Sequence, residues 1–338
     1  MPIQNLSAAI RHQVHAKADL PTDAHGRLYH LGLQRGQVSN LIITVGDELR
    51  ARSIALMFDN ATLKDNVATD VLPQIRNVFS HHSSRGFLTF TGKYKGRPIS
   101  VISIGMGSPM MDFMVREVRT IVDGPLIIIR VGTCGVLGCG MAEEYIARDW
   151  RGIGMLAVAD SSIVVQRNYH YEFKRPPSKT EFDCKEQPAY HLSPIFSADN
   201  NLSQLLKIEA QKQLGIDQVL WCMNASADSF YGSQGRETEH FHDHNDHLLD
   251  TFRKLGVQTL EMETGHLLHL AHCNTGINGN EIRAAAIHVV VADRSSGKFL
   301  VDADQRLFLD RHAARAALDV LASVEIGEKW LEQAYVHL

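Results

Sequence analysis

The chain has 338 residues, of which 44% are hydrophobic and 21% charged, and its net charge is −4. This length leaves room for a sizeable core, and the near-neutral charge argues against a nucleic-acid-binding protein, which normally carries a basic face. Five scattered cysteines without a CxxC pair favour a reducing, cytoplasmic setting over a disulfide framework. The N-terminus lacks the apolar core of a secretory signal, and no apolar run approaches the roughly 20 residues that span a bilayer, so no membrane segment is expected.

Strands and helices are predicted to alternate along the chain. Runs rich in β-branched residues predict strands at 40–46, 98–105, 125–132, 217–225, 256–263 and 283–293. Helical periodicity predicts helices at 108–122, 201–215 and 264–274, with one or two more after residue 305. Several strands are apolar throughout, which is typical of strands covered on both faces. The sequence therefore predicts a single α/β domain with a mostly parallel sheet.

Glycines and polar residues gather where the predicted strands end, as in GD at 46–47, GMG at 105–107, GT at 132–133, EME at 261–263 and DR at 293–294. In open α/β sheets, ligands bind beyond the carboxyl ends of the strands, so we expect the functional site there. The segment GMGSPM (105–110) lacks the third glycine of a dinucleotide fingerprint. Its glycines instead favour a close approach of the backbone to a ligand or another subunit.

Two arginines beside strand-end glycines are candidates for binding an oxyanion. Arg130 lies near the end of an apolar strand, where a guanidinium is costly to bury without an anion, and residues 132–135 predict a loop whose N–H groups and one hydroxyl face that anion. Arg50 lies one turn beyond Gly46. Each has a structural alternative, an internal ion pair for Arg130 and a helix start capped by Asp47 for Arg50. Together the two arginines favour a phosphate site.

The segment SADSFYGSQGRE (226–237) places two aromatic residues, Phe230 and Tyr231, before Gln234 and Arg236. It is too rich in glycine to predict a regular helix. A planar amide and a planar guanidinium beside aromatic rings indicate a planar ligand.

Two carboxylates flank Met262 at a predicted strand-to-helix junction. Such a pair is known from glycosidases, but adjacent strand positions face opposite ways, so the pair shares a face only in a regular strand. We favour a single functional carboxylate, Glu263, that binds sugar hydroxyls, with Glu261 structural.

The histidine-rich stretch EHFHDHNDH (239–247) is a candidate metal site, because such tracts bind zinc. Alternating histidines and acids in a polar loop are more typical of a solvated surface. No metal site is therefore predicted.

The motifs VGDELR, SRGFLTFTGKYKGRPISVISIGMGSP, RVGTCG, SFYGSQGR and LEMET resemble, in this order, the nucleoside phosphorylase-I family, and among its members the uridine phosphorylases. The resemblance runs from Tyr29 to Arg294, with insertions at about 166–195 and 237–250. It implies an N-terminal extension (1–28) and a phosphorylase domain (29–338). The implied fold is a three-layer sandwich with a central mixed sheet flanked by helices.

The resemblance also implies roles for individual residues. The phosphate-binding and catalytic positions correspond to Gly46, Arg50, Arg130 and Thr133, with Arg85 lent by the neighbouring subunit. His30 resembles the histidine that reaches across to the ribose 5′-hydroxyl, and Met262 and Glu263 match the ribose-binding pair. The base-binding positions correspond to Phe230, Gln234 and Arg236, the last two also stabilising the leaving base. The active site is thus expected to be shared within a homodimer.

The implied reaction is the reversible phosphorolysis of uridine in pyrimidine salvage, with inorganic phosphate as co-substrate and no cofactor. Asp293 departs from this pattern, because purine-specific relatives carry an aspartate there, and the adjacent Arg294 is a candidate to neutralise it. A purine or broad-specificity phosphorylase and a non-catalytic nucleoside-binding protein are the alternatives. Gly86 stands where some relatives carry a glutamate for an intersubunit cation, which leaves a cation absent or held by Asp112 and carbonyls near Met106.

Overall fold

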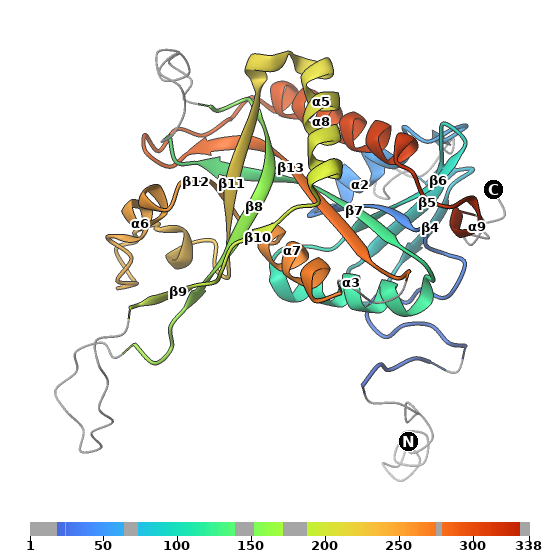
Figure 1. Cartoon of the computed structure of the whole chain (residues 1–338), viewed down its shortest axis with the longest axis horizontal. Coiled ribbons are helices and arrows are strands. Elements are labelled where there is room, and N and C mark those ends of the chain that lie inside the picture. Colours follow the sequence, from blue (N-terminus) through green and yellow to red (C-terminus); the bar gives the residue numbers. More distant parts are fainter. Residues whose placement is uncertain are drawn as a thin grey trace, which may run out of the picture.

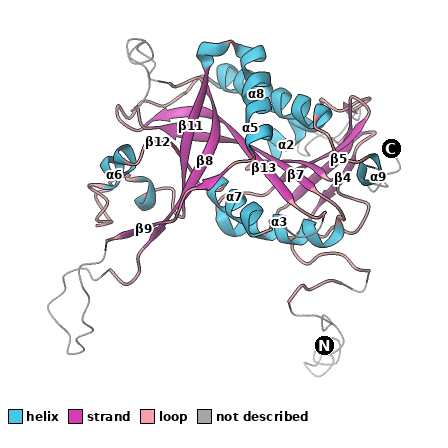
Figure 2. Cartoon of the chain, in the orientation of Figure 1, coloured by secondary structure: helices cyan, strands magenta, loops and turns pink. Residues whose placement is uncertain are grey.

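The structure is a computed structural model that describes residues 19–23, 25–63, 74–138, 152–171, 188–274 and 279–331. Most of the predicted N-terminal extension and the middle of the first predicted insertion, 172–187, lie outside the described residues. The described elements form three layers, with a large sheet between two groups of helices (Figures 1 and 2).

The middle layer is one large mixed sheet. Its strands are β1 (Leu41–Val45), β4 (Phe79–His82), β5 (Leu88–Tyr94), β6 (Arg97–Ser103), β7 (Leu126–Val136), β8 (Leu156–Arg167), β9 (Tyr190–Leu192), β10 (Phe196–Ser197), β11 (Val219–Ala227), β12 (Val257–Glu261) and β13 (Ile282–Asp293). Parallel pairs join β6, β1, β7 and β13 in one group and β8, β11 and β12 in another, whereas β4, β5, β9 and β10 add antiparallel pairs. The short strands β2 (Thr62–Leu63) and β3 (Ile75–Arg76) pair separately.

Helices cover both faces of this sheet. On one face lie α2 (Glu48–Ala55), α5 (Asn200–Leu214) and α8 (Ala303–Ser323), and on the other α3 (Ser108–Ile121) and α7 (Thr264–Cys273). Smaller elements are α6 (Leu248–Lys254), α9 (Glu328–Leu331) and the 3-10 turns η1 (Ile216–Gln218) and η2 (Gly232–Gln234). Among the described residues, none of the helices is both long and apolar enough to cross a membrane. The predicted α/β fold with a central mixed sheet is confirmed.

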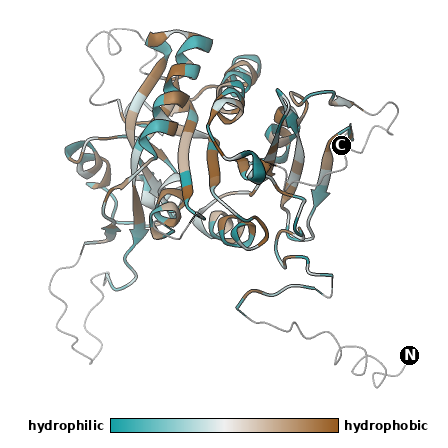
Figure 3. Cartoon of the chain, turned by 45° about the vertical axis from the view of Figure 1, so that its right-hand side comes forward, coloured by the Kyte–Doolittle hydropathy of each residue, from teal (hydrophilic) through white to brown (hydrophobic). Residues whose placement is uncertain are grey.

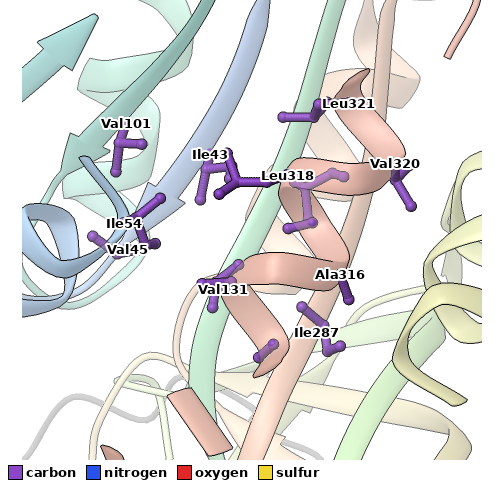
Figure 4. Close-up of a cluster of buried hydrophobic side chains, with 14 of the residues drawn as sticks. Ile43, Val45, Ile54, Val101, Val131, Ile287, Ala316, Leu318, Val320 and Leu321 are labelled. Carbon is purple, nitrogen blue, oxygen red and sulfur yellow. The ribbon is translucent and has the colours of Figure 1, made fainter. Parts of the chain in front are cut away.

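The two cores follow from the alternation of side chains along the buried strands. Ile43 and Ile129 pack against α2 and α8, as Figure 4 shows for Ile43 beside Leu318, whereas Ile42 and Ile128 pack on the α3 and α7 side. Because both faces are covered, these strands are hydrophobic throughout (Figure 3). Arg130, two residues after Ile128, therefore points toward α3 and α7.

Five strands close a ring within the sheet. β13 pairs with both β7 and β8, and β8 connects through β11 and β12 back to β7. Small side chains such as Cys134, Ala157 and Cys222 are buried together with Val136 and Val290 in a cluster of their own. This closure extends β7 to Val136, so the predicted loop at 132–135 is wrong. Those residues are extended strand because β13 pairs with β7 along this whole stretch and β12 pairs with it at Gly135 and Val136.

Candidate active site

A cavity of about 340 Å³ lies at the carboxyl ends of β1 and β12 and against residues 130–135 of β7 and 291–292 of β13. Its lining includes nine of the residues singled out from the sequence, namely Gly46, Arg50, Arg130, Thr133, Phe230, Gln234, Arg236, Met262 and Glu263. They come from four separate segments of the chain, 46–50, 130–133, 230–236 and 262–263. β1 runs parallel to β7 and ends beside Arg130, whereas β12 runs antiparallel to β7 and pairs with it at Gly135 and Val136, and these pairings bring the segments at 46–50, 130–133 and 262–263 together.

Arg50 is held at one end of the cavity by two carboxylates. Asp47 caps α2 by accepting a 2.8 Å hydrogen bond from the Arg50 N–H, and its other oxygen lies 3.1 Å from Arg50 Nη1. Asp310 of α8 accepts from Arg50 Nε at 3.1 Å. Asp47 thus caps the helix, as the structural alternative predicted, and Arg50 lines the cavity as well. A Cβ at Gly46 would lie 3.5 Å from the Gly105 carbonyl oxygen and 3.8 Å from Arg130 Nη2, which are ordinary van der Waals contacts, so Gly46 lies directly beside both groups.

Arg130 lines the same end of the cavity as Arg50. Its Nη2 lies 2.5 Å from Glu263 Oε2, and its Nε lies 3.8 Å from Glu261 Oε2. Arg130 is only 4% exposed, yet its Nε and Nη1 have no hydrogen-bond partner within the described part of the chain. Buried donors without partners are costly, and an oxyanion beside Arg50 and Thr133 would satisfy them. The internal ion pair is thus present, and the two unpartnered donors remain available for an anion.

The two carboxylates around Met262 have different environments. Glu261 accepts hydrogen bonds from Asn224 Nδ2 at 2.8 Å, from the Ser226 hydroxyl and from the Thr264 N–H, and the first-turn N–H groups of α7 are thereby satisfied. Burial raises the pKa of Glu261, but the charges of His288 and Arg130 together with these hydrogen bonds outweigh that effect. The pKa of Glu261 is therefore lowered overall. Glu263 instead spans the cavity, with Oε1 2.5 Å from the Gly107 N–H at the start of α3. Burial raises its pKa, and Arg130 opposes that shift.

His288 of β13 contacts the junction between β12 and α7 from inside the ring of five strands. Its Nε2 lies 3.0 Å from Thr264 Oγ1, the side chain is fully buried, and burial lowers its pKa from 6.5 to about 4. The unfolded chain binds this proton at a higher pH than the folded chain. Stability is therefore unaffected above pH 6.5 and falls between pH 6.5 and 4, by about 2 kcal/mol at pH 5.

We expect His288→Gln to remove most of this acid-dependent loss. Urea unfolding at pH 7 and pH 5 measures it. The exposed His191, replaced by glutamine, should leave the wild-type difference between the two pH values unchanged. A His288→Gln protein as acid-sensitive as the wild type would contradict the assignment.

The other end of the cavity carries Gln234 and Arg236. Gln234 is 3% exposed and closes the 3-10 turn η2, and Gly235 follows in the left-handed region at φ 65°. Arg236 Nη1 donates to Gln234 Oε1 at 2.8 Å and also to the Phe230 carbonyl oxygen. Because a guanidinium only donates, this contact fixes which end of the Gln234 amide is the oxygen.

Phe230 and Arg294 complete this end. The Arg236 guanidinium lies 3.7 Å from the centre of the Phe230 ring. Arg294 Nη2 donates to the backbone carbonyl oxygen of Gln234 at 2.9 Å. Burial, followed by the charge of Arg294, lowers the pKa of Arg236 to about 10, which still leaves it protonated at neutral pH. Arg294 thus supports the turn that carries Gln234.

Asp293 is the last residue of β13, directly before a turn. Its Oδ1 accepts from the Ser295 N–H at 2.9 Å and its Oδ2 from the Ser296 hydroxyl at 2.5 Å. Among the described residues that line the cavity, Asp293 is absent. Its carboxylate is used to shape the turn.

His30 and Arg85 lie away from this cavity, on a surface of the same chain. His30 Nδ1 is 2.6 Å from Glu117 Oε1, and its ring stacks on Phe113 at 3.9 Å. Arg85 donates to the hydroxyl of Tyr29 and lies 4.7 Å from the centre of that ring. Contacts within the same chain thus hold both side chains, with His30 partly exposed and Arg85 exposed.

Two proposed cation-binding segments are arranged differently from a metal site. Asp112 Oδ1 lies 2.9 Å from Arg116 Nε and 3.0 Å from His266 Nε2. The predicted insertion at 237–250 is a loop that leads into α6, and it carries the histidine-rich stretch on the exterior. In the part of the chain that the structure describes, no three His, Cys, Asp or Glu side chains converge on a metal-sized space.

Several functional residues escaped the sequence analysis. Asp310 supports Arg50 from 260 positions away, Glu117 supports His30, and Phe299 and Arg306 line the cavity. Phe299 is recognisable only through its pairing with Ala292 in the folded chain. Arg306 and Asp310 lie four residues apart on one face of α8, a spacing that the sequence shows but that has no motif attached.

Comparison with known proteins gives the family. Residues 41–325 match the model of the phosphorylase superfamily. A uridine phosphorylase of Thermococcus kodakarensis is 28% identical over 318 residues, which cover 94% of this chain and 92% of that protein. A solved uridine phosphorylase structure from the oomycete Phytophthora capsici is 32% identical, covers 93% of this chain and all of that one, and superposes with a TM-score of 0.76.

A purine nucleoside phosphorylase of Toxoplasma gondii shares the fold at 19% identity and a TM-score of 0.59, covering 87% of this chain and 94% of that one. The extent of the family match, together with the paired anion and planar-ligand ends of the cavity, leads to one conclusion. The chain belongs to the phosphorylase superfamily and is a nucleoside phosphorylase.

Proposed function

We propose that the chain catalyses the reversible phosphorolysis of uridine to uracil and ribose 1-phosphate. The observation that carries this proposal is the hydrogen bond from Arg236 Nη1 to Gln234 Oε1 at 2.8 Å. It produces a row of three groups in a fixed order: the Gln234 amide N–H as donor, its oxygen as acceptor and the Arg236 guanidinium as donor.

This row is complementary to uracil. Uracil presents an acceptor, a donor and an acceptor along O2, N3–H and O4, and the Gln234 oxygen has a second lone pair for N3–H. Cytosine presents an acceptor at N3 and a donor at position 4, so two of the three pairings fail. Each unsatisfied buried group costs about 1–3 kcal/mol, and two of them reject cytidine by roughly two to four orders of magnitude.

The rest of the cavity suits the remaining parts of the substrates. The unpartnered Arg130 Nη1 and the nearby Arg50 favour phosphate at one end, and Glu263 between the two ends is placed to bind ribose hydroxyls. In the reaction the C1′–N1 bond stretches first, and charge spreads over the departing base toward O2 and O4. The Gln234 and Arg236 donors stabilise that charge, and phosphate held by the arginines captures C1′.

The assembly proposed for this reaction is a homodimer with shared sites. His30 and Arg85 are supported by Glu117 and Tyr29 but lie outside the cavity of their own chain, so their proposed contacts to ribose and phosphate require a second subunit. Beyond inorganic phosphate as co-substrate, no cofactor or metal is needed for the steps described. The uridine phosphorylases of T. kodakarensis and P. capsici support the uridine assignment by similarity.

A substrate panel tests the proposal. Purified protein should consume uridine only when phosphate is present, and cytidine should be at least about 100-fold poorer in kcat/KM. Inosine should be a poor substrate as well, since the Asp293 carboxylate is engaged in its turn. Phosphate-independent cleavage of uridine, or faster turnover of inosine than of uridine, would contradict the proposed function.

A further inference from the structure

A second cavity adjoins the phosphate end of the first. It measures about 460 Å³ and lies between α2 and α8, which pack on the same face of the sheet. Asp47, Arg50 and Arg306 line both cavities, so these three side chains form the boundary between them. Gln234 and Arg236 line only the first cavity, which means that the second one opens onto the phosphate end alone.

The charges at this boundary are unevenly matched. Arg50 faces the carboxylates of Asp47 and Asp310, and Arg130 faces those of Glu261 and Glu263. The two guanidiniums therefore face four carboxylates and leave no excess of positive charge at the site. A phosphate dianion needs an excess of positive charge nearby.

Arg306 supplies such an excess from within the same chain. Its side chain is exposed and makes no ion pair or hydrogen bond within the described ranges. Arg311, about one and a half turns further along α8, is likewise exposed and lines the second cavity only. The outer wall of this cavity is thus cationic, and its inner wall includes the apolar Ile54, Met57 and Ala314.

We propose that inorganic phosphate approaches the active site through the second cavity and that Arg306 binds it at the boundary. This inference rests on the proposed phosphorolysis. Two features carry it, namely the boundary shared by the cavities and the unpaired charge of Arg306 beside two neutralised arginines. Phosphate then reaches Arg50 and Arg130 without passing the base-binding end.

Single charge-neutralising substitutions test the binding role. Arg306→Gln should raise the KM for phosphate about tenfold, with less than a twofold change in the KM for uridine, because a hydrogen bond to a charged group is lost at the phosphate end only. Arg311→Gln should lower kcat/KM for phosphate several-fold at low ionic strength and approach the wild-type value in high salt. Arg315→Gln, an exposed position on the same helix that lines neither cavity, is the matched control and should behave as wild type.

A steric variant tests the route. Ala303 is an exposed residue at the start of α8 that lines only the second cavity, so Ala303→Trp should narrow it. We expect a several-fold lower kcat/KM for phosphate with an unchanged kcat at saturating phosphate. An Arg306→Gln enzyme with an unchanged KM for phosphate, or an Ala303→Trp enzyme with an unchanged kcat/KM, would overturn the inference. Failure of the wild type to use phosphate at all would instead overturn the proposed function.

Discussion

Uridine turnover should fall about 100- to 1,000-fold when Arg236 is replaced by alanine. The guanidinium donates toward the position proposed for O4, and removing one preorganised donor to a developing anion typically costs about 2.7–4 kcal/mol. The same change releases Gln234 Oε1, which accepts from Arg236 at 2.8 Å, so the amide loses its fixed orientation. Steady-state kcat for uridine at saturating phosphate measures the effect, and discrimination against cytidine should weaken in the same variant.

The fold should survive this change, because Arg236 is half-buried and its side chain donates hydrogen bonds to Phe230 and Gln234 of its own turn. Arg253→Ala, which removes an arginine of α6 that does not line the cavity, is the matched control and should keep its activity. If the Arg236→Ala protein turned over uridine at the wild-type rate, the proposed base recognition would be wrong.

Replacing Arg130 by glutamine should lower kcat/KM at least about 1,000-fold and destabilise the protein as well. Arg130 offers unpartnered donors to phosphate and holds Glu263 at 2.5 Å, so both the phosphate and the ribose contacts are damaged. Loss of one member of a buried ion pair leaves the other charge uncompensated, at about 3–5 kcal/mol. Activity assays and urea unfolding measure the two effects separately.

The double variant Arg130→Gln/Glu263→Gln separates catalysis from stability. Removing both charges should restore much of the lost stability, since the carboxylate nearest to Arg130 is removed with it and Glu261 keeps its hydrogen bonds from Asn224 and Thr264, while activity stays low. Recovery of activity together with stability would show that Arg130 acts only as a structural partner of Glu263.

Much of the site was predictable because its chemistry is carried by short segments. Gln234 and Arg236 are two residues apart, and Met262 and Glu263 are adjacent, so the planar-ligand and carboxylate predictions needed only local sequence. The rule that ligands bind at the carboxyl ends of strands then predicted one common site, although β12 runs antiparallel to β7, so that the site lies where two oppositely directed groups of strands meet. The long predicted helices at 108–122, 201–215 and 264–274 correspond to α3, α5 and α7 within one or two residues.

Other features depend on contacts between distant parts of the chain. The glycines at 132–135 predict a loop, but β7 continues through them because β12 and β13 flank it, a tertiary effect that outweighs the local preference. Asp310 gives no local sign that it will meet Arg50. The sequence also places Asp293 at a strand end without showing that two serines of the following turn bind its carboxylate.

The contacts of Glu117 set a limit on shortening the chain. This buried carboxylate accepts hydrogen bonds from the backbone N–H groups of His30 and Leu31 as well as from the His30 ring. Trimming the chain from its start as far as residue 27 would leave these bonds intact. Trimming past Leu31 would leave the buried Glu117 carboxylate without these hydrogen bonds and would also remove His30. Expression designs and proteolytic fragments that begin beyond that point should therefore be both unstable and defective.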